Sequence, residues 1–312
     1  MIVVLAGGVG AARFLEGVVQ VVPPEQVTAI VNTGDDITLH GLYISPDVDI
    51  VTYTLAGIIE ETNGWGIRGD TTNVLDMLTT LGADTSWFLL GDRDIATHIR
   101  RTELLRAGKT RAEIADEFRR ALGVQTRVLP MSNEPVATMI DTPAGLMHFE
   151  NYLVQRHAQD EVRGVVFAGA ETAQPAPGVL EAIREAEVVL IAPSNPIVSV
   201  GTILAVPGVR AALLETSTPV VAVSPIVGGA AIKGPAAPLM QSQGYEVSAR
   251  GVADCYREIA DALIIDHVDA DLADDIRARG LDVVITDTIM RGPAEKRALA
   301  QVALDAARSV TR

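Results

Sequence analysis

Four aspartates lie in one short segment of the chain, and their side chains are suited to hold a divalent metal ion. Asp35 and Asp36 are adjacent, and Asp47 and Asp49 follow in the same stretch. Mg²⁺ prefers oxygen ligands and is usually bound by one or two carboxylates together with substrate phosphates. Loop aspartates also cap helices, and Asp49 is placed to cap a helix that begins at Ile50. We favour the metal site, with Asp36 and Asp49 as the direct ligands.

The chain opens with a second candidate site, a glycine-rich turn that suits a phosphate group. Gly7, Gly8, Val9 and Gly10 directly follow the apolar run Ile2–Ala6 and begin a helical pattern. Glycines let the backbone approach a ligand closely, and the free N–H groups of a helix N-terminus attract an anion. The alternative is a tight turn that binds nothing, but the mechanism favours phosphate binding.

As a dinucleotide-binding fingerprint, this turn is incomplete. Arg13 stands where a third glycine or alanine belongs. The next apolar run ends in Asn32, where an acidic residue would bind a ribose. A nicotinamide-dependent oxidoreductase is therefore a weak interpretation.

Polar residues follow two later apolar runs in the same way. Ser194 and Asn195 come directly after one run, and Gly229 and Lys233 come shortly after another. Ligands of open α/β sheets bind outside the carboxyl ends of the strands, so these clusters should converge on one crevice. We expect them to bind a nucleotide-like phosphate ester. Lys233 can pair with a phosphate, although it can also be an ordinary surface lysine.

Two glycine-containing loops carry aromatic and charged side chains that suit a flat ring. A ring can stack on Trp65, although a tryptophan there can also simply anchor its loop. The histidines show no zinc-binding spacing, and His148 is placed to line the pocket. The residues expected near the ring are Trp65, Arg68, Asp70, Trp87, Asp92, Arg93 and His148.

Short aliphatic runs that alternate with helical patterns predict the elements that hold these residues. Such alternation indicates βαβ units and a Rossmann-like, doubly wound, mostly parallel sheet. Strands are predicted at Ile2–Ala6, Val27–Asn32, Gly164–Phe167, Val188–Ala192, Pro219–Val223, Leu263–Asp266 and Val283–Thr286, and helices at Ala11–Val21, Pro177–Ala186, Val209–Leu214, Ala270–Arg279 and Ala294–Ala307.

The stretch from about residue 63 to residue 125 has a different pattern, with amphipathic helices and little strand between them. We interpret residues 1–312 as a single Rossmann-like α/β domain in which this stretch is a helical cap. The helices are predicted at Thr72–Leu81, Ile95–Ala107 and Arg111–Leu122, and short strands follow at Val124–Leu129, Val136–Asp141 and Leu146–Phe149, the last two as a hairpin.

Charge and composition limit the partners. The 312 residues carry a formal net charge of −15, and such an acidic surface repels nucleic acid and anionic membranes. The single cysteine, Cys255, excludes an internal disulfide. No apolar stretch approaches the roughly 20 residues of a membrane span, and the first residues lack the basic start of a signal peptide. We therefore expect a cytoplasmic protein.

Seven motifs, in order along essentially the whole chain, resemble the 2-phospho-L-lactate transferase family of coenzyme F-420 biosynthesis, which is a phosphoenolpyruvyl transferase family in bacteria. The departures are small, such as Ala12 and Thr202 in place of an expected Gly and Pro. The motifs are LAGGVGAARFLEG, VNTGDDITLHGLYISPDVDIVTYTLAG, NGWGIRGDT, WFLLGDRDIATHIRRT, LPMSNEPVATMI, APSNPIVSVGTILAVPGVR and VSPIVGGAAIKGP.

The resemblance implies a homodimer, Mg²⁺, and transfer of a phospholactyl or phosphoenolpyruvyl group from a guanosine diphospho-ester to the deazaflavin Fo. The terminal ribityl hydroxyl of Fo would attack phosphorus in line, and GMP would leave. Metal held by Asp36 and Asp49 would neutralise the phosphoryl oxygens, and Asp35 would orient or deprotonate the hydroxyl. The two acids differ by two hydrogens, so the carried acid stays open.

The main alternative is a nucleotide-sugar-binding regulator of the gluconeogenesis-factor type, which resembles this chain in fold and in its opening glycine loop. The aspartate-rich segment NTGDDITLHGLYISPDVD, followed by NGWGIRGDT, favours the transferase.

Overall fold

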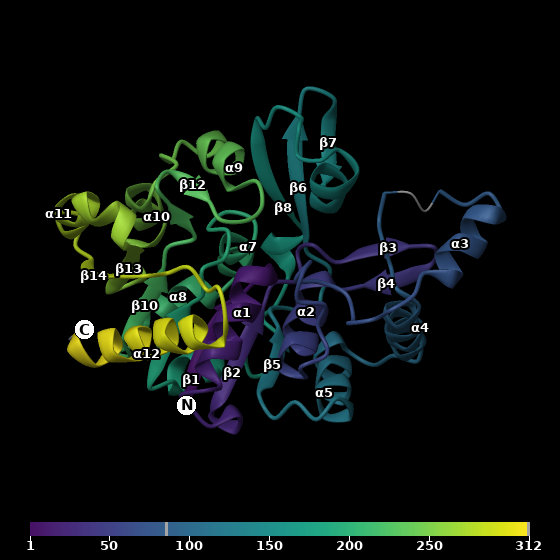
Figure 1. Cartoon of the computed structure of the whole chain (residues 1–312), viewed down its shortest axis with the longest axis horizontal. Helices are drawn as coiled ribbons and strands as arrows, with labels where there is room; N and C mark the ends of the chain where they lie inside the picture. The colour runs from purple at the N-terminus through teal and green to yellow at the C-terminus, as the bar shows by residue number, and fades with distance from the viewer. Residues whose placement is uncertain (85–86, 311–312) are drawn as a thin grey trace.

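A seven-stranded parallel sheet forms the centre of the molecule, of which the computed structural model describes residues 1–84 and 87–310 (Figure 1). Every neighbouring pair of strands in it is parallel. The predicted Rossmann-like α/β class is thus confirmed. In spatial order the strands are β14 (Asp282–Thr286), β13 (Ala262–Asp266), β10 (Val220–Val223), β9 (Val188–Ile191), β1 (Ile2–Ala6), β2 (Val27–Val31) and β5 (Arg127–Pro130).

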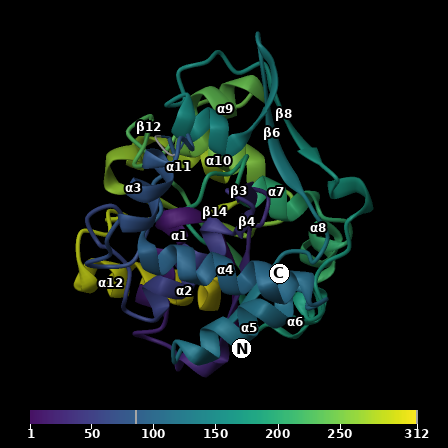
Figure 2. The same cartoon turned by 90° about the vertical axis from the view of Figure 1, so that its right-hand side faces the viewer.

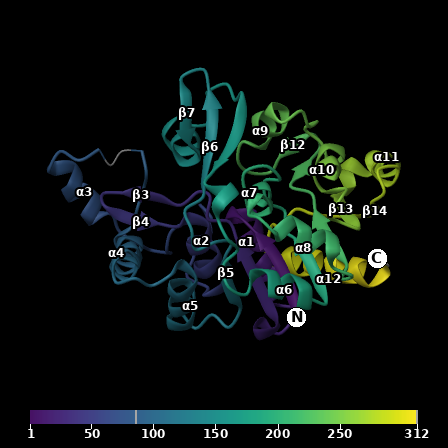
Figure 3. The same cartoon turned by 180° about the vertical axis from the view of Figure 1, so that it is seen from behind.

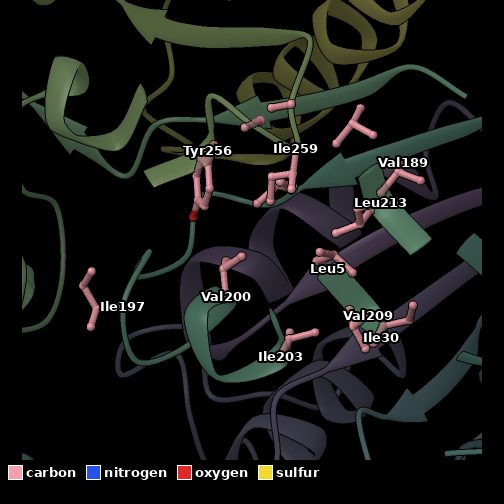
Figure 4. Close-up of a cluster of buried hydrophobic side chains, with 14 of the residues drawn as sticks. Leu5, Ile30, Val189, Ile197, Val200, Ile203, Val209, Leu213, Tyr256 and Ile259 are labelled. Atoms are coloured by element: carbon pink, nitrogen blue, oxygen red, sulfur yellow. The ribbon is translucent and has the colours of Figure 1, made fainter. Parts of the chain in front are cut away.

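Helices cover both faces of the sheet, because successive strand residues point to opposite sides. Val4 of β1 packs in one buried cluster with Phe14, whereas Leu5 packs in another with Ile203 and Leu213 (Figure 4). The first face is covered by α1 (Gly8–Val18), α2 (Pro46–Leu55), α5 (Arg111–Ala121) and α12 (Pro293–Ser309), and the second by α6 (Val179–Glu185), α7 (Val200–Ala205), α8 (Val209–Glu215), α9 (Ala236–Ser242), α10 (Ala249–Tyr256) and α11 (Ala273–Arg277).

The two layers are visible from opposite sides of the molecule. Helices α1 and α12 cross the front of the sheet in Figure 1, and α6 and α8 cross it in the view from behind in Figure 3. Among the described residues, no helix is both long enough and apolar enough to cross a lipid bilayer.

The side of the sheet on which the chain adds new strands changes between β1 and β9, although all the strands stay parallel. From β1 the chain adds β2 and β5 on one side, whereas β9 is followed by β10, β13 and β14 on the other. The loops after the two central strands therefore diverge and leave a crevice at the carboxyl edge. Gly7 follows β1 and Ala192 follows β9, so the predicted glycine turn lies at this point.

Smaller elements extend the carboxyl edge. A hairpin of β3 and β4 lies with α3 and α4 at one end of the molecule, which faces the viewer in Figure 2. A three-stranded antiparallel sheet and a second hairpin complete the edge. These elements are β3 (Ile37–Leu39), β4 (Leu42–Ile44), α3 (Asn73–Thr80), α4 (Asp92–Arg106), β7 (Gly145–His148), β6 (Ala137–Thr142), β8 (Gly164–Ala168), β11 (Ile226–Val227), β12 (Ala230–Ala231), a π-helix (Asn151–Gln155) and the 3₁₀ turns Pro24–Gln26, Ala170–Thr172 and His267–Leu272.

Two predicted strands form but change their place. Gly164–Phe167 becomes β8, which pairs antiparallel with β6 and stays outside the central sheet. Val124–Leu129 instead becomes β5, which joins the central sheet beside β2, and α5 buries Ala115 against the same face. Apolar periodicity identifies a strand but does not specify the strand it pairs with. The predicted hairpin of β6 and β7 is confirmed.

Candidate functional site

A cavity of about 990 Å³ opens beyond the carboxyl ends of β1, β2 and β9. Its volume is at the upper end of ordinary small-molecule sites, so it has room for a large ligand or two smaller ones. Two sets of residues line it. We call the polar set the sheet-edge wall, formed by Gly7–Gly10, Asp35, Asp47, Ser194 and Asn195, and the apolar set the loop wall, formed by Trp65, Trp87, Phe88, Phe149 and Leu153.

The glycine turn of the sheet-edge wall is held by the loop after β9. The Gly7 N–H donates to Ser194 Oγ (3.2 Å), and the same hydroxyl donates to the Gly7 carbonyl (2.9 Å). A β-carbon on Gly10 would lie 2.3 Å from the Pro193 carbonyl oxygen, so only glycine allows this close approach. Helix α1 then begins without a side-chain cap. Its N-terminus borders the cavity and is suited to an anion.

Beside this turn, Asn32 holds two carboxylates next to each other. Its Nδ2 donates to Asp35 Oδ2 and to Asp47 Oδ2, each at 3.0 Å. All three residues are buried, and Asp35 Oδ1 has no hydrogen-bond partner in the described structure. Asn32, which replaces the acidic residue of a dinucleotide fingerprint, therefore serves to position acids and leaves one of their oxygens free.

The two carboxylates are costly to ionise where they lie. Burial raises the pKa of Asp35 well above its ordinary value, and the charge of Asp47 raises it further. Burial likewise raises the pKa of Asp47 to about 7, against the opposing effect of the Asn32 hydrogen bond. Within the described part of the chain, the largest influences on the pKa of either carboxylate do not include a cation. A bound divalent cation would supply the missing positive charge.

Asp36 and Asp49, the predicted ligands, already have partners. Asp36 accepts hydrogen bonds from the Tyr43 and Ser45 hydroxyls, each at 2.6 Å, and Arg111 lies 3.9 Å away. Asp49 forms a buried bidentate ion pair with Arg101. Asp36 is also not among the described residues that line the cavity.

The geometry thus favours Asp35 and Asp47 over Asp36 and Asp49 as the metal-binding pair, while any metal binding stays a prediction. Residues 1–84 and 87–310 contain no group of three or more acidic, histidine or cysteine side chains that could hold a metal together. Two carboxylates completed by substrate phosphates are the usual arrangement for Mg²⁺, and Asp35 and Asp47 fit it.

Glu150, which was not predicted from the sequence, lies between Phe149 and the π-helix. It lines the cavity, and only 6% of its surface is exposed. Burial raises its pKa to about 8, and the charges of Asp47 and Asp36 contribute. A carboxyl group with a pKa near neutrality in a ligand cavity is a candidate for proton transfer. No motif marks it, because a lone glutamate after an apolar strand is common.

The loop wall brings together the two predicted tryptophans. Trp65 and Trp87 both line the cavity, and Trp87 packs edge-on against Phe88 with ring centroids 5.5 Å apart. Phe149 and Leu153 extend the apolar lining. This surface can accept a flat, apolar ring.

The other residues predicted to contact the ring do not line the cavity within the described chain. Asp70 accepts hydrogen bonds from the Arg93 and Asp94 N–H groups and so caps α4. Asp92 accepts from the Val74 N–H and the Thr71 hydroxyl and so caps α3. The predicted residues outside the lining are Arg68, Asp70, Asp92, Arg93 and His148, together with Gly229 of the expected phosphate site.

Local hydrogen bonds account for the positions of the other three residues that were predicted to contact the ring, Arg68, Arg93 and His148. The Arg68 guanidinium donates to the Gly57 carbonyl, and the Arg93 guanidinium donates to the Arg68 carbonyl at 3.4 Å. His148 Nδ1 accepts from the Glu150 N–H at 3.2 Å. These side chains therefore stabilise the loops that shape the cavity, whereas Lys233 does line it.

Comparison with known proteins shows the family of the chain. The family model described as 2-phospho-L-lactate transferase CofD matches residues 2–304. A phosphoenolpyruvate transferase of Streptomyces griseus subsp. griseus is 44% identical, with 99% of each chain covered. A 2-phospho-L-lactate transferase of Methanococcoides burtonii is 40% identical, with 93% of this chain and 94% of the relative covered.

A solved structure shows the fold independently. The crystal structure of a UPF0052 family protein from Bacillus halodurans matches with a TM-score of 0.63 and 17% identity, covering 97% of this chain and 98% of that chain. At this identity the likeness supports the shared α/β architecture and nothing further.

Proposed function

The chain belongs to the 2-phospho-L-lactate transferase family of coenzyme F-420 biosynthesis, and from that premise we propose its substrates and cofactor. It transfers a phospholactyl or phosphoenolpyruvyl group from a guanosine diphospho-ester to the deazaflavin Fo and releases GMP, with Mg²⁺ as cofactor. Relatives named for either acid are about equally similar to it, so both donors remain in the proposal. The homodimer that the resemblance implies stays a prediction.

The observation that supports this proposal is the division of one cavity into two chemically different walls. The α1 N-terminus and Lys233 suit the diphosphate of the donor, and Trp65 and Trp87 suit the deazaflavin ring. Because the walls share the cavity, the ribityl hydroxyl of Fo can reach phosphorus at their junction. Proximity of this kind supplies much of the rate enhancement in a two-substrate transfer.

The residues of this junction suggest how the transfer proceeds. Asp35 and Asp47 would hold Mg²⁺, which would neutralise charge on the phosphoryl oxygens. The hydroxyl oxygen of Fo forms a bond to the phosphorus that carries the acid, and the bond from that phosphorus to the GMP oxygen breaks. Glu150 in its ionised form accepts the hydroxyl proton and becomes a neutral carboxyl group, a role that was predicted for Asp35 from the sequence. Asn32 keeps Asp35 and Asp47 adjacent throughout.

The proposal is tested by incubating the purified protein with Fo, Mg²⁺ and either guanosine donor, and following GMP and the product by mass. We expect product with at least one donor and loss of activity with a chelator. No product with either donor, together with tight binding of a UDP-sugar, would contradict the transferase and favour the regulator.

A further inference from the structure

Two cations border the cavity, and the proposed function uses only one of them. Arg13 and Lys233 are the only arginine and lysine among the described residues that line it. Neither forms an ion pair with a carboxylate in the part of the chain described. Burial lowers the pKa of Lys233, and the charge of Arg13 lowers it further, so the two charges are close enough to repel. Two neighbouring like charges of this kind favour the binding of an anion.

Both cations meet the N-terminus of α1. A β-carbon on Gly64 would lie 2.5 Å from Val9 Cγ1 and 3.4 Å from Lys233 Nζ, so the loop, the glycine turn and the lysine are packed together. Arg13 is on α1 itself, and helix side chains tilt toward the helix N-terminus. The positive end of the helix dipole and both side chains therefore face the same part of the cavity.

Both cations also hold the loop that carries Trp65. Arg13 Nη2 donates to the Glu61 carbonyl at 3.4 Å, and Lys233 Nζ donates to the Asn63 carbonyl. Trp65 follows two residues later and forms part of the loop wall. Lys233 is exposed and Arg13 is partly buried, and a hydrogen bond to a neutral carbonyl leaves the charge of each side chain unbalanced. Both charges therefore stay available to an anion in the cavity.

We propose that Arg13 and Lys233 form a two-cation site for the donor diphosphate, and that this site couples donor binding to the position of the Trp65 loop. A diphosphate between the cations removes their repulsion, so both stay in place and keep their hydrogen bonds to the loop. Donor binding then stabilises the wall that receives the acceptor ring. The inference rests on the proposed function, since it assumes that the bound anion is a diphosphate.

The coupling has a reciprocal consequence. If a diphosphate tightens the binding of Fo, Fo must tighten the binding of the diphosphate by the same factor. Couplings between two sites are typically about 5-fold or more. We expect the dissociation constant of each ligand to fall by that factor in the presence of the other.

The experiment uses the fluorescence of Trp65 in the full chain. Trp87→Phe leaves Trp65 as the single tryptophan, because the chain has two. Inorganic pyrophosphate is titrated with Mg²⁺ present. We expect a saturable change in Trp65 emission, and Arg13→Gln and Lys233→Gln should each raise the dissociation constant about 10-fold or more. Glutamine keeps an N–H donor for the loop carbonyl but removes the charge.

Arg106→Gln is the matched control. Arg106 also donates to a main-chain carbonyl at 3.4 Å, that of Gly41, but it is not among the described residues that line the cavity. The control should bind pyrophosphate within about twofold of the parent. The inference is overturned if both cavity variants, shown to be folded by their thermal unfolding, bind pyrophosphate like the control. It is also overturned if Trp65 emission does not respond to saturating pyrophosphate.

Failure of the inference and failure of the proposed function can be distinguished. Absence of any transfer product with an intact, charge-dependent Trp65 response would remove the proposed function and leave the two-cation site. Normal transfer by Arg13→Gln and Lys233→Gln, with an unchanged KM for the donor, would remove the site and leave the function.

Discussion

The sheet-edge wall and the loop wall of the same cavity are built in opposite ways. Asn32 is fully buried and Ser194 is only 3% exposed, and both are fixed by hydrogen bonds at the ends of parallel strands. Trp65 is 38% exposed and comes from a connecting loop. The sheet-edge wall is thus part of the core, whereas the loop wall depends on caps and contacts of its own.

This difference in construction indicates which part of the proposed reaction each wall determines. Protein groups that must be placed within tenths of an ångström, such as metal ligands and the N–H groups that donate hydrogen bonds to a phosphate, belong on rigid elements. An apolar ring needs a surface more than a fixed atom, and loops can supply one. We therefore expect changes in the sheet-edge wall to affect turnover, and changes in the loop wall to affect acceptor affinity.

The largest effect is expected from Asp47→Asn. Loss of one of the two carboxylates that we propose bind the metal should lower kcat about 1000-fold, because metal ions contribute several kcal/mol to such transfers. The fold should persist, since Asn removes a charge that is unfavourable to bury. Steady-state kinetics measures the loss, with the surface variant Asp305→Asn as control. Turnover near that of the control would contradict the expectation that the sheet-edge wall determines turnover.

The choice between Asp47 and Asp49 shows where the sequence stops being informative. The segment was identified from its residue types, but α2 begins at Pro46 and not at Ile50. Residues two apart on a helix point to different sides. Asp47 therefore faces Asn32, and Asp49 faces Arg101. Both aspartates line the cavity, but only Asp49 is paired with an arginine, and the spacing alone could not decide which of the two has a cation as its partner.

The loop wall was harder to predict than the sheet. The alternating aliphatic runs indicated the strands of the central sheet, because buried parallel strands are apolar throughout. Asp70 and Asp92, by contrast, resemble ligand-binding residues in sequence. In the structure, however, Asp70 caps α4 and Asp92 caps α3, and each of these helix ends is distant in sequence from the aspartate that caps it. Hydrogen bonds between separate loops leave no periodic pattern along the chain.

The second largest effect is a loss of stability, which we expect from Arg101→Leu. Arg101 is buried and lies behind the sheet-edge wall. It leaves the buried Asp49 carboxylate without its partner, so the free energy of unfolding should fall by about 3–5 kcal/mol. Urea denaturation followed by circular dichroism measures it. The double variant with Asp49→Leu should recover part of the loss. An unchanged midpoint for Arg101→Leu would show that this pair does not support the wall.

Glu150→Gln tests the electrostatics where the walls meet. Burial raises the pKa of Glu150 to about 8 in the folded protein, so the folded state retains a proton that the unfolded state releases near pH 4–5. Stability should therefore fall as the pH rises from about 5 to about 8, by a few kcal/mol. Thermal unfolding in a chelator measures this fall, which should be shallower in the glutamine variant. Identical pH profiles would contradict the assignment.

The smallest effect is expected in the loop wall. Trp87→Ala should raise the KM for Fo about 10-fold, since aromatic stacking on a flat ring contributes about 1–3 kcal/mol. At saturating Fo, where the coupling through the Trp65 loop is complete, the KM for the guanosine donor should stay constant, because we propose that the donor binds at the other wall. Initial rates with each substrate varied in turn, and the other saturating, measure both values. Equal changes in the two KM values would mean that Trp87 supports both substrates.

We propose that Asp35 and Asp47, rather than Asp36 and Asp49, hold the metal at the sheet-edge wall. This assignment can be tested by electron paramagnetic resonance of Mn²⁺, with Mn²⁺ in place of Mg²⁺ and GDP in place of the donor. We predict that Asp35→Asn/Asp47→Asn abolishes the bound-Mn²⁺ signal, whereas folded Asp36→Asn retains it. A retained signal in the double variant, with its loss in Asp36→Asn, would contradict the claim.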